Sequence, residues 1–298
     1  MKRVLVTGHA GFVGSRFLAL AGQDYDIIRA GRSNSDVFID LTDNNSIAAA
    51  ISRAQPDVVI NFAAISSIDE CEKEAGNLSG YVYKTNVLGP KYLALACKQN
   101  GARMIQISTD FVFSGKKETA PYEEIDSPDP INWYGRTKYA AELEVIKELP
   151  GACVARIKHP FAANFPKKKD LIRTIIQTLK SGQEFIGIAD NKMNPTFCDD
   201  IAVAIKKLIS ANSSGIYHLA GASWHSAYEI GLLVAGVFGL DKSKVIRTTL
   251  DEFSAMSKWT PRAKYSWVSI KKFTNEFGET FHDLPSSLKI MKKQMELV

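Results

Sequence analysis

The sequence predicts an α/β protein built on a doubly wound parallel sheet, with helices on both faces of the sheet. Short apolar segments with strand character alternate with longer segments of helical spacing. The segments with strand character include residues 4–6, 25–30 and 57–62, and the segments of helical spacing include 12–21 and 84–99. This alternation indicates βαβ units. Their right-handed crossovers place helices on both faces.

The second half of the chain changes character. Strands at 103–108 and 153–157 and a helix at 137–149 continue the alternation, but prolines then interrupt it. Helices at 170–181 and 199–210 are followed by shorter elements. We therefore expect a first domain over 1–160, to which 190–212 returns. A smaller C-terminal α/β domain over 161–298 would cover the strand ends and bind a substrate.

Composition narrows the class of protein. The 298 residues are 45% hydrophobic and 23% charged, which is ordinary for a soluble globular protein. No segment has the roughly 18 apolar residues of a membrane helix, and we expect the longest, 230–240, to be a buried helix. The four cysteines form no CxxC pair, and the first residues do not resemble a secretory signal. We expect a cytoplasmic protein with reduced thiols and no membrane contact.

The net charge of +5 comes partly from lysine runs at 167–169 and 292–293. We interpret them as solvated surface; the alternative is a surface that attracts a phosphorylated ligand. No basic stripe with interleaved aromatic residues indicates nucleic-acid binding. No HExxH motif or cysteine pair indicates a metal site. We expect neither nucleic acid nor metal as a ligand.

A glycine-rich loop directly follows the first predicted strand. Gly8, Gly11 and Gly14 have GxxGxxG spacing, with Phe12 and Val13 before the last glycine. The first glycine allows a tight turn, the second lets a pyrophosphate approach the backbone, and the third lets the helix pack on the strand. The helix N-terminus adds free N–H groups that favour negative charge. The loop predicts a Rossmann-type dinucleotide site rather than a turn without a ligand.

The tip of the second strand indicates which dinucleotide binds. Proteins that bind NAD commonly have an acidic residue there for the ribose hydroxyls. Residues 27–33 contain no acid, and Arg32 lies at the tip. An arginine suits the 2′-phosphate of NADP. NADP is therefore the expected cofactor, with NAD left open and a plain surface arginine as the alternative.

A tyrosine and a lysine provide candidate catalytic groups. Tyr134 and Lys138 have YxxxK spacing, which places them on one face of a helix. A neighbouring ammonium would lower the pKa of the tyrosine, which could then donate a proton to a carbonyl oxygen as hydride arrives. Thr109, or Ser108 before it, ends a predicted strand, where open α/β sheets bind ligands. Either hydroxyl could orient the substrate carbonyl.

Together these motifs resemble the extended short-chain dehydrogenase/reductases. The resemblance rests on the GxxGxxG loop, the strand end Asn61-Phe62-Ala63-Ala64, the segment Ser108-Thr109-Asp110 and YxxxK. Segments 39–43, 56–61, 108–115 and 122–138 are similar to the dTDP-4-dehydrorhamnose reductase branch, the RmlD-like sugar-nucleotide reductases.

The resemblance implies a role for each matching residue. Tyr134 would be the proton donor, with Thr109 and Asp110 assisting at the substrate, and Lys138 would also hold the nicotinamide ribose. The remaining residues would bind the cofactor: Gly8, Gly11, Phe12, Val13 and Gly14 at the pyrophosphate, Asp40 and Leu41 at the adenine, and Ala63 and Ala64 along its length.

Two segments depart from that branch, and both are expected to border the sugar nucleotide. The chain has His159 in a segment where the branch has a tryptophan, and its residues 259–267 lack an Arg-Pro-x-x-Ser-x-Leu pattern. His159 could contact cofactor or substrate; as an ordinary loop histidine it would make a structural hydrogen bond. Phe111 occupies the position of a glutamate in related dehydratases, which disfavours dehydration.

The resemblance implies an NAD(P)H-dependent reductase of the 4-keto group of a nucleotide-linked deoxysugar, as in dTDP-rhamnose biosynthesis. The expected partners are a sugar-nucleotide substrate and a second copy of the chain in a homodimer. Two alternatives stay open. One is a non-catalytic, cofactor-binding regulatory subunit of another enzyme, because fold and motif do not prove turnover. The other is a nucleotide-sugar epimerase.

Overall fold

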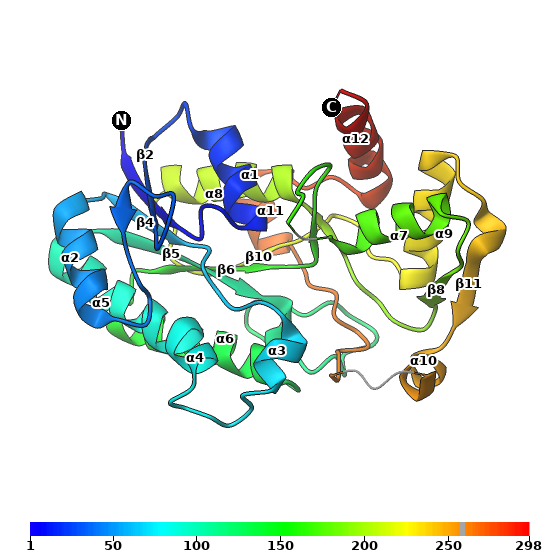
Figure 1. Ribbon diagram of the computed structural model, residues 1–298, viewed down its shortest axis with the longest axis horizontal. Coiled ribbons are helices and arrows are strands. Elements are labelled where there is room, and N and C mark those ends of the chain that lie inside the picture. Colours follow the sequence, from blue (N-terminus) through cyan, green and yellow to red (C-terminus); the bar gives the residue numbers. More distant parts are fainter. Residues whose placement is uncertain (168, 257–259, 298) are drawn as a thin grey trace.

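A seven-stranded parallel sheet forms the centre of the molecule (Figure 1). The structure is a computed structural model that describes residues 1–167, 169–256 and 260–297. The strand order is β10-β6-β5-β4-β1-β2-β3, and all neighbours are parallel. The predicted doubly wound α/β class is confirmed. The strands are β1 (Arg3–Thr7), β2 (Asp26–Gly31), β3 (Val37–Phe38), β4 (Val58–Asn61), β5 (Arg103–Thr109), β6 (Cys153–Ile157) and β10 (Gly215–Leu219).

Alternate side chains of each strand pack against helices on opposite faces of the sheet. Val4 and Val6 of β1 belong to a core that includes three helices, and Leu5 between them belongs to the core of the opposite face. Successive strand side chains point to opposite faces, so one strand anchors both layers. The first face carries α1 (Phe12–Ala21), α8 (Cys198–Ser210) and α11 (Lys271–Phe277); the second carries α2 (Asn44–Ala54), α5 (Gly89–Asn100) and α6 (Trp133–Glu148).

The order of strands reverses between β1 and β4. From β1 the chain proceeds to β2 and β3 on one side, whereas β4 starts again beside β1 and leads to β5 and β6 on the other side. In open α/β sheets, ligands bind at such a switch point, beyond the carboxyl ends of the strands. The segments that follow β1, β4 and β5 are therefore the ones that this topology brings to a site.

The last strand of the sheet comes from the C-terminal half of the chain. β10 pairs in parallel with β6, from Gly215 to Leu219. The preceding helix α8 packs on α1, where Arg16 and Asp199 form an ion pair at 2.5 Å. The sequence led us to expect that the segment returning to the sheet ends at residue 212. It extends through β10, and α11 packs on β10.

The rest of the second half forms a smaller part with its own core, at the right of Figure 1. Ile172, Ile176, Ile230 and Leu288 are fully buried in this core. The predicted helix over 230–240 corresponds to the later part of α9, which ends at Phe238. No helix within the described ranges is long and apolar enough to cross a membrane. The elements are α7 (Leu171–Lys180), α9 (Ala227–Phe238), α10 (Leu250–Met256) and α12 (Leu284–Glu296), with parallel strand pairs β8 (Phe185–Ile188)/β11 (Val245–Thr248) and β7 (Pro160–Phe161)/β9 (Thr196–Phe197).

The predicted helix over 84–99 has an irregular start. Residues Lys84–Leu88 form a π-helical turn, η1, and α5 begins at Gly89. Pro90 has no N–H to donate to the carbonyl of Asn86, so the regular pattern is interrupted there. The short elements are α3 (Ile68–Glu72), α4 (Tyr81–Tyr83) and the 3-10 turns η2 (Asp110–Val112) and η3 (Lys242–Lys244).

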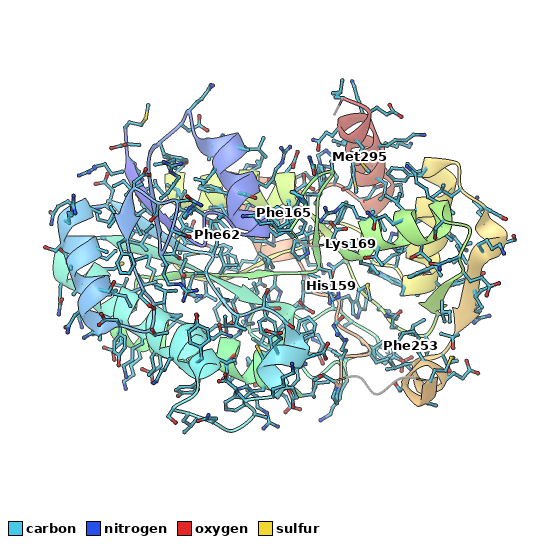
Figure 2. All side chains as sticks on the ribbon, viewed as in Figure 1. Phe62, His159, Phe165, Lys169, Phe253 and Met295 are labelled. Atoms are coloured by element: carbon cyan, nitrogen blue, oxygen red, sulfur yellow. The ribbon has the colours of Figure 1, made fainter. Side chains whose placement is uncertain are left out.

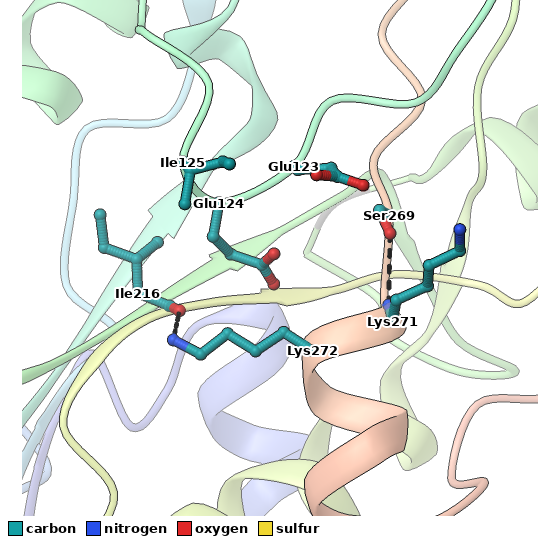
Figure 3. Close-up of a pocket in the computed structure, with 7 residues that line it drawn as sticks. All are labelled: Glu123, Glu124, Ile125, Ile216, Ser269, Lys271 and Lys272. Atoms are coloured by element: carbon teal, nitrogen blue, oxygen red, sulfur yellow. Dashed lines mark hydrogen bonds between the residues drawn. The ribbon is translucent and has the colours of Figure 1, made fainter.

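A surface pocket of about 450 Å³ lies along the outer edge of β10 (Figure 3). The Glu124 carboxylate accepts a hydrogen bond from the His218 backbone N–H at 2.9 Å, and the Lys272 ammonium donates to the Ile216 carbonyl at 2.6 Å. These side chains occupy backbone groups that another strand would use, so they protect the sheet edge. The pocket is lined by Glu123, Glu124, Ile125, Ile216, Ser269, Lys271 and Lys272.

Candidate active site

The glycine loop is a tight turn whose backbone the phosphate groups of a ligand could approach closely. Gly8 has a φ of 63°, and a Cβ there would lie 2.6 Å from the Ala63 nitrogen. A Cβ on Gly14 would clash with the Gly8 carbonyl. The N-cap of α1 is Gly11, which has no side chain to accept from the N–H groups of the first turn. The predicted Gly8, Gly11 and Gly14 thus form a cradle that a dinucleotide pyrophosphate fits.

The smaller part of the molecule contacts this loop. The ring of Phe12 lies 5.2 Å from that of Phe165, and the Arg173 guanidinium lies 5.4 Å from the Phe12 ring. Figure 2 shows Phe165 in the middle of the molecule, above His159. Phe12 therefore joins the loop to the smaller part of the molecule, and Val13 packs against the core of the sheet.

The residues expected at the adenosine end lie together after β2 and β3. Arg32 is exposed, and its charge contributes to a lowered pKa of Asp40, for which hydrogen bonds from Thr42 are the larger cause. The Asp40 carboxylate accepts from the Thr42 N–H and hydroxyl at 2.9 and 2.8 Å. Leu41 is buried against Gly89, where a Cβ would lie 2.9 Å from its side chain. Arg32 is thus available to an anionic ligand, whereas Leu41 lies mostly in the core.

A buried amide network positions the segment after β4. The Asn61 side chain accepts a hydrogen bond from the Thr7 hydroxyl at 2.5 Å and from the Ala63 N–H at 3.2 Å. Its amide nitrogen donates to Gln106 at 2.8 Å. The network therefore ties β1, β4 and β5 together and holds the Ala63 N–H. Sequence reasoning did not identify Gln106 or Thr7, although a polar side chain in an otherwise apolar strand is a signal for such a network.

Tyr134 lies in the first turn of α6, beside the end of β5. The helix begins at Trp133, earlier than the predicted residue 137, because the Asn132 side chain caps it by accepting from the Gly135 N–H at 2.9 Å. The Tyr134 ring meets the Phe111 ring edge-on at 5.6 Å. Burial raises the pKa of Tyr134, and a hydrogen bond from Thr109 opposes that shift. The structure thus brings Tyr134 and Thr109 together.

Lys138 lies one turn further along α6 and is buried. Its ammonium donates to the Ile107 carbonyl at 2.6 Å, and burial lowers its pKa to about 8. The expectation that Lys138 lowers the pKa of Tyr134 is wrong for this structure, because burial of the phenol dominates. Tyr134 is consequently protonated at neutral pH, which is the state a proton donor requires.

The two hydroxyls at the end of β5 have different surroundings. The Ser108 hydroxyl donates to Glu142, which also forms a buried ion pair with Arg156 at 2.6 Å. The Thr109 hydroxyl instead bonds to Tyr134 and lies 3.3 Å from Asp110 Oδ1. Of the two candidates, Thr109 is therefore the one that faces the tyrosine.

Asp110 is 2% exposed and forms an ion pair that sequence reasoning missed. Its Oδ2 lies 2.5 Å from the ammonium of Lys158, which also donates to the Ser266 hydroxyl at 2.6 Å. Burial raises the pKa of Asp110, and the charge of Lys158 opposes that shift. Asp110 thus contacts Thr109 and Lys158 and supports the site from behind. The only sequence signal for Lys158 was a lysine that directly follows a buried strand.

His159 adopts a left-handed backbone conformation, with a φ of 34°, and stacks on Phe111 at 6.0 Å. Burial lowers the pKa of His159 well below its ordinary value. Within the described ranges its buried Nδ1 has no hydrogen-bond partner, so the structural hydrogen bond expected of a loop histidine is absent at that atom. The Trp133 indole nitrogen is likewise buried without a partner in the described chain. Both groups are therefore candidates to contact a bound ligand.

The C-terminal segment 260–267 crosses beside the start of α6. Thr260 donates to Asp69 at 2.6 Å, and the Asn132 side chain donates to the Pro261 carbonyl at 3.0 Å. Ser266 contacts Lys158 as described above. Trp259 and Lys168, which belong to segments singled out from the sequence, lie outside the described residues. The described part of the segment therefore contacts Asn132, the residue that caps α6, and its expected place beside a sugar nucleotide stays a prediction.

No group of three or more histidine, cysteine, aspartate or glutamate side chains in the described ranges could hold a metal ion. The four cysteines are buried and free.

Comparison with known proteins gives consistent results. The chain matches the family model described as RmlD substrate binding domain over residues 1–297. SpsK, a spore coat polysaccharide biosynthesis protein of Bacillus subtilis, is 32% identical, covering 90% of this chain and 89% of that protein. The dTDP-4-dehydrorhamnose reductase of Mycolicibacterium smegmatis is 32% identical, covering 91% and 79%.

Two further similarities are informative. Methionine adenosyltransferase 2 subunit beta of Danio rerio is 29% identical, covering 83% of this chain and 77% of that protein. The crystal structure of dTDP-4-dehydrorhamnose reductase from Bacillus anthracis in complex with NADP has a TM-score of 0.88 at 26% identity, covering 98% of this chain and 99% of that one.

Proposed function

Because this chain belongs to the RmlD substrate binding domain family, we propose that it is an NADPH-dependent reductase of a 4-keto nucleotide-linked deoxysugar. The observation that carries the proposal is the juxtaposition of a half-buried, protonated Tyr134 with Thr109 at the end of β5. The glycine cradle lies across the same sheet edge, after β1. Relatives named as dTDP-4-dehydrorhamnose reductase and a similar structure with bound NADP support the choice of reaction and cofactor.

Each part of the cofactor would have a defined position. The glycine loop and the N-terminus of α1 would bind the pyrophosphate. Arg32 would bind the 2′-phosphate, with Asp40 and Leu41 at the adenine. Ala63 and Ala64 would lie along the cofactor, and Lys138 would hold the nicotinamide ribose. When bound, NADPH would supply the hydride.

The chain's own residues would handle the proton. The Thr109 hydroxyl would orient the substrate carbonyl, and the Tyr134 phenol would donate its proton to the carbonyl oxygen as that oxygen gains charge. A raised pKa keeps the phenol protonated at neutral pH. The site is therefore set for reduction of a ketone. Asp110 and Lys158 would hold Thr109 in place.

The test combines purified protein, NADPH or NADH and a dTDP-4-keto-6-deoxysugar made in the same vessel. We expect NADPH oxidation in step with formation of the reduced sugar. Tyr134→Phe removes the proton donor and should lower kcat by about 10²–10⁴-fold with an unchanged Kd for NADPH. Unchanged turnover in Tyr134→Phe contradicts the role of the phenol. Isomerised sugar without net NADPH oxidation indicates an epimerase instead.

A regulatory subunit is the second candidate, and the similarity to methionine adenosyltransferase 2 subunit beta favours it. A protein of this kind would keep the cofactor cradle and bind a separate catalytic chain. Size-exclusion chromatography of the affinity-purified protein from its native cells, followed by mass spectrometry, tests this candidate. A stoichiometric hetero-complex, with no oxidation of NADPH by any 4-keto sugar nucleotide, would replace the reductase proposal.

A further inference from the structure

His159 lies in the middle of the molecule, between the sheet and the smaller part, and the proposed reaction assigns it no role (Figure 2). It is the second residue after β6, which pairs in parallel with β5 so that Ile157 lies opposite Thr109. The imidazole stacks on Phe111 at 6.0 Å, and the Tyr134 ring meets the same Phe111 ring edge-on at 5.6 Å. His159 therefore lies next to the groups that would hold the ketone.

One nitrogen of the His159 ring lacks a hydrogen bond. Its Nδ1 is buried and has no partner in the part of the chain that the structure describes. Burial lowers the pKa of His159 well below its ordinary value, and the charges of Lys158 and Arg262 act in the same direction, so the ring is neutral at physiological pH. Nδ1 of a neutral imidazole either donates or accepts one hydrogen bond. A buried polar atom without that bond is destabilising, so a bound ligand is the expected partner.

The backbone that carries the ring is held in a conformation that residues with a Cβ rarely adopt. His159 has a φ of 34°, in the left-handed region. Thr196 of β9 fixes it, because the Thr196 N–H donates to the His159 carbonyl at 3.3 Å and the Thr196 hydroxyl donates to the Lys158 carbonyl at 2.6 Å. Thr196 is fully buried. The imidazole is therefore held in a defined position, as a group that selects a ligand must be.

The place of His159 in the sheet favours contact with the sugar over contact with the cofactor phosphates. β5 and β4 separate β6 from β1, whose loop forms the phosphate cradle. In the proposed reaction the ketone lies at Tyr134 and Thr109, and the sugar ring extends from that carbonyl. A sugar hydroxyl both donates and accepts, so it can pair with Nδ1 in either tautomer of the neutral ring.

We propose that His159 is a specificity residue that hydrogen-bonds a ring hydroxyl of the sugar nucleotide through Nδ1 and thereby favours hydroxylated sugars over their deoxygenated forms. A sugar without that hydroxyl would leave Nδ1 buried and unpaired in the complex, which is how a polar site rejects an analogue that lacks the matching group. The inference rests on the proposed function and concerns which sugars the site accepts.

Equilibrium binding tests this without turnover. Calorimetry measures the Kd values of dTDP-rhamnose, which has no ketone to reduce, and of dTDP, which has no sugar, for protein saturated with NADP⁺. His159→Phe keeps an aromatic ring against Phe111 but removes both ring nitrogens. We expect it to weaken binding of dTDP-rhamnose about three- to tenfold, while the Kd values of dTDP and NADP⁺ stay unchanged.

Two matched variants separate the hydrogen bond from the other properties of the ring. His159→Asn keeps a polar group on a side chain that tolerates a positive φ, so it should retain most of the affinity for dTDP-rhamnose. His282→Phe changes a half-exposed ring that pairs with Asp200 at 2.8 Å, away from Phe111, and should bind all three ligands as the wild-type protein does.

Deoxygenated ligands identify the group that Nδ1 contacts. The 2-deoxy and 3-deoxy forms of dTDP-rhamnose are titrated into the wild-type and His159→Phe proteins. We expect the wild-type protein to bind one of them about three- to tenfold more weakly than dTDP-rhamnose, and the variant to bind that form and dTDP-rhamnose equally. The same loss in both proteins for each analogue would show that Nδ1 contacts neither hydroxyl and would overturn the inference.

The remaining outcomes distinguish this inference from the proposed function. Weaker binding of dTDP in His159→Phe would place Nδ1 at the diphosphate, and weaker binding of NADP⁺ alone would place it at the cofactor; either result overturns the inference and leaves the reductase standing. If His159→Phe does not fold, ¹⁵N NMR of the wild-type protein decides. The Nδ1 resonance, assigned by its loss in His159→Asn, should shift further with dTDP-rhamnose than with dTDP, and equal shifts overturn the inference. A wild-type protein that binds dTDP-rhamnose no better than dTDP would contradict the proposed substrate class as well.

Discussion

At the scale of single residues, the site contains groups whose charged forms are destabilised by burial. Tyr134 carries a raised pKa and Lys138 a lowered one, in both cases chiefly because of desolvation. A group buried in this way costs stability and is retained for a role in the site. The loss of stability caused by burial can be measured separately from the role of the group in the site, because the free energy of unfolding and cofactor binding respond differently to pH.

Lys138→Met should therefore stabilise the protein near neutral pH while weakening NADPH binding. The pKa of Lys138 falls from 10.5 to about 8 on folding, so the unfolded chain binds its proton more tightly. The stability contributed by this group consequently rises with pH between about 8 and 10.5. Thermal melts should show the variant more stable at pH 7, by about 1–3 kcal/mol, with the gap closing toward pH 10. A variant less stable than wild type by the same amount at both pH values would contradict this explanation.

At the scale of elements, the glycine loop depends on the close approach of α1 to the turn after β1. Gly14→Ala places a methyl group on the Gly8 carbonyl and should weaken NADPH binding at least about tenfold by displacing the loop. Gly151→Ala is the matched control, because nothing lies within 4 Å of a Cβ there. Fluorescence titration with NADPH checks both. Equal affinity of the Gly14→Ala protein and the control would show that the loop tolerates the displacement.

Element prediction from the sequence succeeded where a local pattern was strong. The apolar strands β1, β4 and β6 and the glycine loop were visible because each residue's role follows from its neighbours in the chain. β10 was missed because its sequence, Gly-Ile-Tyr-His-Leu, mixes polar and apolar side chains at a sheet edge. Lys158 was missed as an ion-pair partner because Asp110 and Ser266 lie 48 and 108 residues away in the chain. Such partners leave no local signal.

At the scale of the whole molecule, Lys158 connects the sheet with the C-terminal segment. It follows β6, pairs with Asp110 after β5 and reaches Ser266. Lys158→Met leaves a buried carboxylate unpaired and should lower the free energy of unfolding by about 3–5 kcal/mol. Lys158→Met/Asp110→Asn removes both charges and should recover most of that loss. Urea denaturation measures all three proteins, and a double variant as unstable as the single one would show that the ion pair is not the cause.

The two parts of the molecule meet where the proposed reaction would occur. The sheet contributes the phosphate cradle, Thr109 and Tyr134, and the C-terminal half contributes Phe165 beside the loop and residues 260–266 beside α6. His159 and Trp133 offer buried polar atoms at this junction. This arrangement supports a cofactor bound mainly by the sheet and a sugar nucleotide bound mainly by the second half.

Transfer of an isotopic label tests the central claim most directly. The protein is incubated with NADPH deuterated at the reactive C4 position of the nicotinamide and with a dTDP-4-keto-6-deoxysugar, and the product is analysed by mass spectrometry and NMR. The account predicts one deuterium on C4 of the sugar when the transferred face is labelled, and none when the opposite face is labelled. A product without deuterium from either cofactor, or no product while NADPH binds normally, would contradict it.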